Sequence, residues 1–179
     1  MSDIGSDDIG SWFSEEELTV LRHRLPFLYL DILPVRVDAD GQITEIATLL
    51  RTPREGGIRR ALCSGRVMYH ERLRDAIARH LDKDLGPMAL PRLPVSIVPF
   101  TIAEYFPTPG ITPYHDPRQH AVSLAYIVPV DGDCVPSQDA LEIAWNAPEE
   151  IIDPTVLGEM VDGHAALIRT ALATTGRLV

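Results

Sequence analysis

The stretch from residue 65 to residue 86 constrains the fold most tightly. It reads GRVMYHERLRDAIARHLDKDLG and predicts a short loop followed by an amphipathic helix over about residues 71–85. Gly86 and Pro87 then end the helix. Its apolar side chains recur at helical spacing, at Leu73, Ala76, Ile77, Leu81 and Leu85. A helix with one apolar face must pack that face against another layer, so this segment predicts a layered domain.

Apolar segments on both sides of this helix predict strands. The expected strands cover residues 27–37, 44–50, 96–105, 121–130 and 141–145. The other expected helices cover residues 14–23, where Ser14 and Glu17 form a capping box, and 155–173. Long loops are expected at 52–64 and 107–119. This order predicts an α/β fold, an α/β/α sandwich with a mixed β-sheet.

Charge and composition limit the classes of function. The 179 residues carry 16 basic and 26 acidic side chains, a formal net charge of -10, which disfavours nucleic acid and anionic membranes as partners. No apolar run is long enough to span a membrane, and two cysteines fit a reducing compartment. The start has no signal-peptide pattern, and we expect residues 1–11 to form an acidic, disordered lead-in. We therefore expect a cytoplasmic protein.

Basic side chains concentrate between residues 51 and 66. This window holds Arg51, Arg54, Arg59, Arg60 and Arg66 against one acid, Glu55. Guanidinium groups match phosphate geometry, so the cluster predicts a discrete anionic ligand, with Arg54 among the candidate contacts. The alternative is that several of these arginines only pair with surface acids.

The 65–86 segment resembles the Nudix box, G-x5-E-x7-R-E-U-x-E-E-x-G-U, where U is a bulky aliphatic residue. Five positions match without a gap: Gly65, Glu71, Arg79, Leu81 and Gly86. The resemblance implies a Nudix-type α/β/α sandwich. It also implies a structural ion pair between Glu71 and Arg79.

The box departs from the family where metal is bound. The family's three glutamates correspond here to His80, Lys83 and Asp84. A carboxylate in the last turn faces the negative end of the helix dipole, so Asp84 needs a cation. That cation could be His80, an arginine from elsewhere, or one weakly held Mg²⁺ or Mn²⁺ that the backbone of Gly65 also ligates.

The flanks are similar to one Nudix subgroup, the GDP-mannose mannosyl hydrolases. The segment RTPREGGIRRALCSGRV, residues 51–67, resembles that subgroup in length and at both ends. This resemblance implies that Arg51 and Arg66 bind diphosphate and that Asp31 contacts the base or sugar. An acid inside an apolar strand also needs a partner, so a structural pair with an arginine is the alternative for Asp31.

The subgroup's metal-ligand Gln and catalytic His correspond to Asp139 and Ala140, counting back from Trp145. Asp139 is a candidate metal ligand, but Ala140 cannot accept a proton. A substitute base must come from elsewhere, and the 107–120 loop offers His115, Asp116 and His120, unless that loop is only solvated.

Together these features favour a divergent, divalent-metal-assisted Nudix hydrolase of a nucleoside diphosphate-linked substrate, such as a nucleotide sugar. Asp31, His80 and His120 are the catalytic candidates. The alternative is an inactive Nudix-fold protein that binds a nucleotide or phosphorylated metabolite. The expected Nudix-like domain covers residues 12–153, with residues 154–179 forming a C-terminal helix on the same domain, and the family implies a homodimer.

Overall fold

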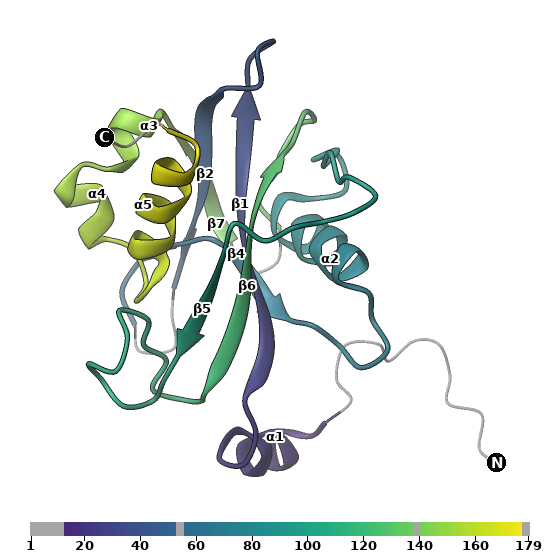
Figure 1. Cartoon of the computed structure of the whole chain (residues 1–179), viewed down its shortest axis with the longest axis vertical. Helices are drawn as coiled ribbons and strands as arrows, with labels where there is room; N and C mark the ends of the chain where they lie inside the picture. The colour runs from purple at the N-terminus through teal and green to yellow at the C-terminus, as the bar shows by residue number, and fades with distance from the viewer. Residues whose placement is uncertain (1–12, 53–55, 138–139, 177–179) are drawn as a thin grey trace.

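A mixed β-sheet lies between two groups of helices in the computed structural model of the chain (Figure 1). The structure describes residues 13–52, 56–137 and 140–176. The strands are β1 (Phe27–Val37), β2 (Ile43–Arg51), β3 (Arg59–Ala61), β4 (Cys63–Arg66), β5 (Thr101–Tyr105), β6 (Ala121–Pro129) and β7 (Ala140–Asn146). The helices are α1 (Glu15–Arg22), α2 (Leu73–Leu85), α3 (Pro148–Ile151), α4 (Pro154–Gly158) and α5 (His164–Thr174). The predicted α/β/α sandwich with a mixed sheet is confirmed.

Strand β1 is the centre of the sheet. It pairs in parallel with β6 along its length, and the other strand pairs are antiparallel. The main path runs β3-β2-β1-β6-β5, with β4 added to β1 and β7 added to β2. The edge of β1 away from β6 is shared: β4 pairs with residues 29–32 and β2 pairs with residues 35–37. The sheet therefore forks along this edge.

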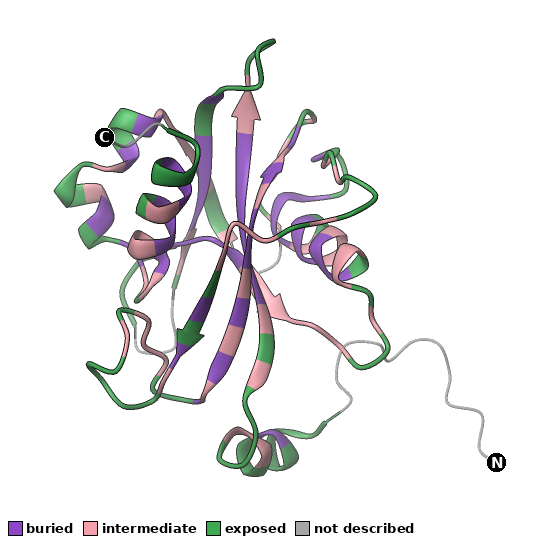
Figure 2. Ribbon diagram, in the orientation of Figure 1, coloured by how far each residue is buried: buried purple, intermediate pink, exposed green. Residues whose placement is uncertain are grey.

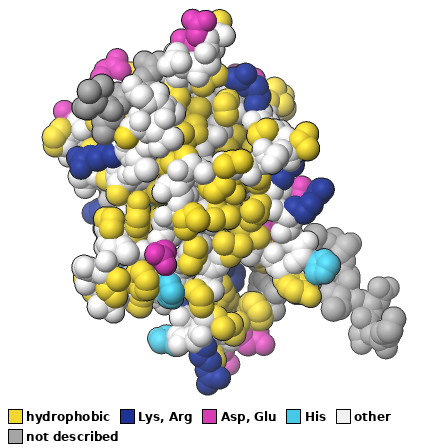
Figure 3. Space-filling model, in the orientation of Figure 1, with side chains coloured by type: hydrophobic (Ala, Val, Ile, Leu, Met, Phe, Trp, Pro, Cys, Tyr) yellow, Lys and Arg dark blue, Asp and Glu magenta, His cyan; other side chains and the backbone are white. Residues whose placement is uncertain are grey.

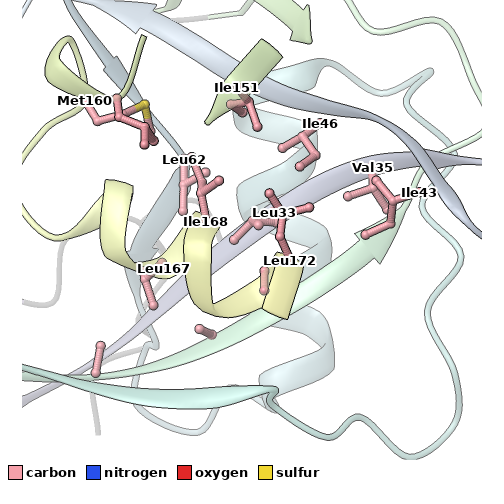
Figure 4. Close-up of a cluster of buried hydrophobic side chains, with 14 of the residues drawn as sticks. Leu33, Val35, Ile43, Ile46, Leu62, Ile151, Met160, Leu167, Ile168 and Leu172 are labelled. Carbon is pink, nitrogen blue, oxygen red and sulfur yellow. The ribbon is translucent and has the colours of Figure 1, made fainter. Parts of the chain in front are cut away.

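Each face of the sheet buries its own core, because alternate residues of a strand point to opposite faces. Leu30 and Ile32 of β1 pack with the apolar face of α2. Leu33 and Val35 pack on the opposite face with residues of α4 and α5, as Figure 4 shows for Leu167, Ile168 and Leu172. Buried residues, drawn in purple, lie on β1 and on α2 and α5 at either side of the sheet in Figure 2. The sheet therefore separates the α2 side of the molecule from the α5 side.

Local sequence signals set the ends of the first two helices. The Ser14 hydroxyl accepts from the Glu17 N–H while Glu17 accepts from the Ser14 N–H, so the predicted capping box is confirmed. Helix α2 ends at Gly86, whose φ of 81° is accessible to glycine. No helix in the described part of the chain is long and apolar enough to cross a membrane.

Three expected elements differ from the structure. The expected loop at 52–64 contains β3 and the start of β4. The expected strand at 96–105 begins only at Thr101. The expected helix at 155–173 is divided into α4 and α5, because Gly163 takes a φ of 85° between them. The expected lead-in at residues 1–11 lies outside the described residues.

Candidate functional site

Asp84, in the last turn of α2, is the centre of a buried charged cluster on the α2 side of the sheet. It is 1% exposed. Nη2 of Arg51, from the end of β2, lies 2.6 Å from Oδ1 of Asp84. Nζ of Lys83 lies 3.2 Å from the same oxygen. The predicted alternative in which Asp84 pairs with an arginine from elsewhere in the chain is therefore what the structure shows.

Several polar atoms in this cluster lack a hydrogen-bond partner among the described residues. Oδ2 of Asp84, Nε and Nη2 of Arg51 and Nδ1 of His80 are all buried without one. Arg51 is close to Asp84, but its N–H groups make no aligned hydrogen bond. Buried polar groups in proteins are nearly always satisfied, so this concentration of unsatisfied atoms indicates a place where a polar ligand can bind.

His80 is packed into this cluster as a neutral side chain. Its Nε2 lies 3.0 Å from the Arg66 carbonyl oxygen, which can only accept, so Nε2 carries the proton. Burial lowers the pKa of His80. A Cβ on Gly65 would lie 2.0 Å from the His80 ring. Gly65 is therefore needed because the ring fills the space where a side chain would be.

The ion pair between Glu71 and Arg79 holds the loop before α2. Arg79 donates to both carboxylate oxygens of Glu71, at 2.6 and 2.8 Å, and also to the Arg66 carbonyl. Burial raises the pKa of Glu71, but hydrogen bonds from Arg79 and the Met68 N–H outweigh it and leave the pKa lowered. The predicted structural ion pair is confirmed.

Several arginines of the 51–66 cluster make contacts with other parts of the chain. Arg59 donates to the Met160 carbonyl, and Arg60 pairs with Glu159 at 2.6 Å. Arg66 lies over the Phe27 ring, 5.8 Å from its centroid. Arg54 and Asp139, predicted as substrate and metal ligands, lie outside the described residues.

Asp31 lies on the opposite side of the sheet from Asp84. It is 3% exposed, and its Oδ2 accepts from the Tyr105 hydroxyl at 3.0 Å. Nε2 of His164, the first residue of α5, lies 3.4 Å from Oδ1, while Nδ1 of His164 accepts from the Leu62 N–H. Asp31 is therefore partnered by a tyrosine and a histidine, where the sequence suggested an arginine. The structure does not bring Asp31 and Asp84 together.

The loop residues proposed as substitutes for the missing base lie apart from Asp84. His120 stacks on Phe106, with centroids 4.5 Å apart, and lines a cavity to which α2 contributes no residue. His115 lies 3.3 Å from Asp162, and Asp116 pairs with Arg118 at 2.8 Å. Hydrogen bonds from Arg118 and Gln119 lower the pKa of Asp116 although burial raises it.

A divalent metal does not fit the donors around Asp84. The described residues contain no group of three or more His, Cys, Asp or Glu side chains that could hold a metal ion. Two cations, Arg51 and Lys83, face one carboxylate, so the cluster carries an excess positive charge. Mg²⁺ and Mn²⁺ prefer oxygen ligands, whereas this cluster offers mainly N–H donors. The arrangement favours an anion.

Some of these contacts could not be found in the sequence. The sequence places Lys83 at the position of a family glutamate, but nothing in it shows that Lys83 pairs with Asp84. His164 carries no local signal, because nothing within residues 155–173 shows that this position meets Asp31.

Comparison with solved structures identifies the class of fold. A structure from Jonesia denitrificans, described as a possible asymmetric diadenosine tetraphosphate (Ap4A) hydrolase, is 57% identical, with a TM-score of 0.85, over 87% of this chain and 98% of that one. A NUDIX hydrolase from Nitrosomonas europaea is 15% identical, with a TM-score of 0.60, over 84% of this chain and 91% of that one. The sheet and helices are those of the Nudix hydrolase fold.

A third similar structure contains a ligand and a metal. It is a bifunctional NMN adenylyltransferase/ADP ribose pyrophosphatase from Francisella tularensis, complexed with AMP and a Mn ion. It is 16% identical, with a TM-score of 0.58, over 89% of this chain and 46% of that one. No curated protein matches the chain. The chain belongs to the family described as a domain of unknown function, DUF4916, which matches residues 8–177.

Proposed function

We propose that this protein binds the phosphate chain of a nucleoside di- or polyphosphate beside α2, with Arg51 and Lys83 as its phosphate ligands. The observation that carries the proposal is the convergence of these two cations on one buried carboxylate, with N–H groups of Arg51 left unsatisfied. A phosphate oxygen is a strong acceptor for such groups.

Asp84 has a defined part in this proposal. In the free protein it holds both cations in place and limits their repulsion. When a phosphate enters, the unsatisfied N–H groups of Arg51 donate to it, and Lys83 is shared between carboxylate and phosphate. Arg66, in β4 next to Gly65, is the candidate contact for a further phosphate of the same chain. Asp31 is too well enclosed by its own partners to be part of this step.

The relatives support a nucleotide with several phosphates. The Jonesia denitrificans protein, at 57% identity, is described as a possible hydrolase of Ap4A, in which a chain of phosphates joins two nucleosides. A polyphosphate offers more negative charge to Arg51, Lys83 and Arg66 than the diphosphate of a nucleotide sugar does. The nucleotide sugar remains part of the proposal as a weaker ligand.

Hydrolysis of the bound nucleotide is a second candidate, favoured by the description of that same relative. The experiment that separates the two measures nucleotide binding by calorimetry with EDTA or with Mg²⁺, and products by chromatography. The ligands are Ap4A, ADP and GDP-mannose. We expect Ap4A to bind in EDTA and to lose about tenfold or more in affinity with Arg51→Gln, since one charge-assisted contact is lost.

Arg92→Gln is the matched control, because Arg92 is a surface arginine paired with Asp131 at 3.0 Å. It should leave the affinity unchanged. Binding that requires Mg²⁺, or equal binding by wild type and Arg51→Gln, would contradict the proposal.

Asp84→Asn sharpens the choice between the two functions. If Arg51 and Lys83 bind phosphate directly, removing the competing negative charge should tighten Ap4A binding in EDTA. If Asp84 instead serves a metal-assisted hydrolysis, the same variant should lose turnover in Mg²⁺ or Mn²⁺. Circular dichroism checks that the variant is folded.

A further inference from the structure

A cavity lined by cationic side chains lies between the end of α1 and the 107–120 loop. It has a volume of about 320 Å³. Arg22, His23 and Arg24 line it from the helix end, and Arg118, Gln119 and His120 line it from the loop. Dark blue and cyan side chains lie together at the lower end of the view in Figure 3. None of the described residues that line it is acidic. Arg22 lies 4.0 Å from Glu15 and Arg118 pairs with Asp116, so among the described residues Arg24 is the arginine of this cavity left without an acidic partner.

Hydrogen bonds fix several side chains of this cavity before any ligand arrives. Nε of Arg22 donates to Oε1 of Gln119 at 3.3 Å, and Gln119, 2% exposed, donates to Asp116 at 3.0 Å. Asp116 also accepts two hydrogen bonds from the Arg118 guanidinium. Because these groups are already ordered, a ligand would lose less free energy in arranging them.

Ring nitrogens supply further polar groups. Nδ1 of His23 lies 2.8 Å from the Thr19 carbonyl and must donate to it, which leaves Nε2 of His23 available. The His120 ring is held by its stack on Phe106, and its Nε2 is buried without a hydrogen-bond partner among the described residues. A buried nitrogen without a partner is a second sign, independent of charge, that a polar group belongs here.

Size and charge define the class of ligand. The cavity volume is at the lower end of the range for small-molecule sites, too small to enclose a whole dinucleotide. Arginine side chains recognise phosphate oxygens through paired N–H donors. We propose that this cavity binds the phosphate group of a small phosphorylated metabolite, at a site separate from the Asp84 cluster.

The test uses inorganic phosphate and glycerol 3-phosphate as probes, titrated by calorimetry into the full chain at low salt with EDTA. Both probes carry the phosphate, and tighter binding of glycerol 3-phosphate identifies an organic phosphate as the preferred source. We expect Arg24→Gln to weaken binding about tenfold or more, because a charge-assisted contact is lost. Arg92→Gln, the surface control, should leave it unchanged.

Backbone amide NMR shifts locate the site without relying on variants. The expected result is that phosphate moves the signals of Gln119 and His120, and that Arg24→Gln reduces this movement. The inference is overturned if neither probe binds, if Arg24→Gln binds as wild type does, or if phosphate moves only the signals of Lys83 and Asp84. The last outcome would leave the proposed function of the Asp84 cluster standing, so the two can fail separately.

Discussion

Two buried carboxylates on opposite faces of one sheet are stabilised in opposite ways. Asp84, 1% exposed, faces two positive charges, Arg51 and Lys83. Asp31, 3% exposed, is held by the Tyr105 hydroxyl and by His164, whose Nδ1 accepts from Leu62 and so leaves a proton on Nε2. The two carboxylates are therefore similarly buried. Asp84 lies among positive charges on the α2 side, whereas Asp31 lies among neutral partners on the α5 side.

This difference separates a site that can exchange partners from a contact that fixes the structure. Arg51 and Lys83 have side-chain exposures of 21% and 28%, so both side chains keep some contact with solvent. Tyr105 and His164 are 8% and 6% exposed and join β5 and α5 to β1. The burial of Tyr105, followed by the nearby charge of Asp31, raises the pKa of its hydroxyl far above the ordinary value, so it remains a donor.

The largest expected effect is that of Asp84→Ala. Breaking a buried ion pair leaves charge uncompensated, and because Arg51 and Lys83 keep some access to water we expect a loss of about 3 kcal/mol in the free energy of unfolding. Urea denaturation measures it. Asp75→Ala, which removes a surface pair with Arg72, is the control and should cost less than about 1 kcal/mol. Equal losses in the two variants would remove the contrast between buried and surface carboxylates.

Asp31→Ala should lower the free energy of unfolding by about 2 kcal/mol, because it leaves two neutral donors without an acceptor. Asp31→Asn keeps an acceptor for Tyr105 and should cost less. The same urea experiment measures both, and nucleotide binding provides the second readout. We expect Asp31→Asn to bind Ap4A as wild type does, and a loss comparable to that of Arg51→Gln would place Asp31 in the ligand site after all.

The glycines beside the two clusters give a matched test of packing. Gly65→Ala would place a methyl group 2.0 Å from the His80 ring and should destabilise the protein by about 1–3 kcal/mol. Adding His80→Ala opens the space, so the double variant should lose less than the sum of the two single changes. On the α5 side, a Cβ at Gly163 would lie 2.9 Å from Tyr105, and Gly163 has a φ of 85°. No substitution at Tyr105 should therefore fully restore the stability of Gly163→Ala. If the stability losses of Gly65→Ala and His80→Ala simply add, the clash with the His80 ring is not the cause of the Gly65→Ala effect.

The smallest effect is a pH dependence from His80. Burial places its folded-state pKa below the ordinary value of 6.5. The unfolded chain therefore binds the proton more readily, and stability is complete above about pH 6.5 and falls as the pH drops below it. His80→Gln can still donate to the Arg66 carbonyl and should flatten the slope below about pH 6.5. An unchanged slope would show that other groups control it.

The sequence predicted those features that depend on local pattern. The helical spacing from Leu73 to Leu85, the Ser14 cap and the Glu71–Arg79 pair are all encoded within a few turns of chain, and the structure confirms them. The contacts that define the two carboxylates are not local. Asp84 meets Arg51 across 33 residues, and Asp31 meets Tyr105 across 74, so neither pairing leaves a periodic signal.

The short strands were missed for a related reason. β3 has three residues and β4 has four, and both include polar side chains such as Arg60 and Ser64. Segments this short form because β2 and β1 offer them unpaired edges, which is a property of the assembled sheet. His164 likewise becomes important only when α5 packs on β1.

The fork in the sheet also explains why a proline, Pro34, is tolerated in the middle of the central strand. The Val67 N–H donates to the Leu28 carbonyl, so the even-numbered residues of β1 direct their polar groups towards the β4 and β2 edge. Pairing with β4 ends at Ile32 and pairing with β2 begins at Val35, so Pro34 stands where neither strand is attached. A proline has no N–H to donate, and here none is required. The imino acid thus marks the boundary between two registers: β4 and β2 cannot merge into one continuous neighbour of β1, and the end of β2 that bears Arg51 diverges towards α2.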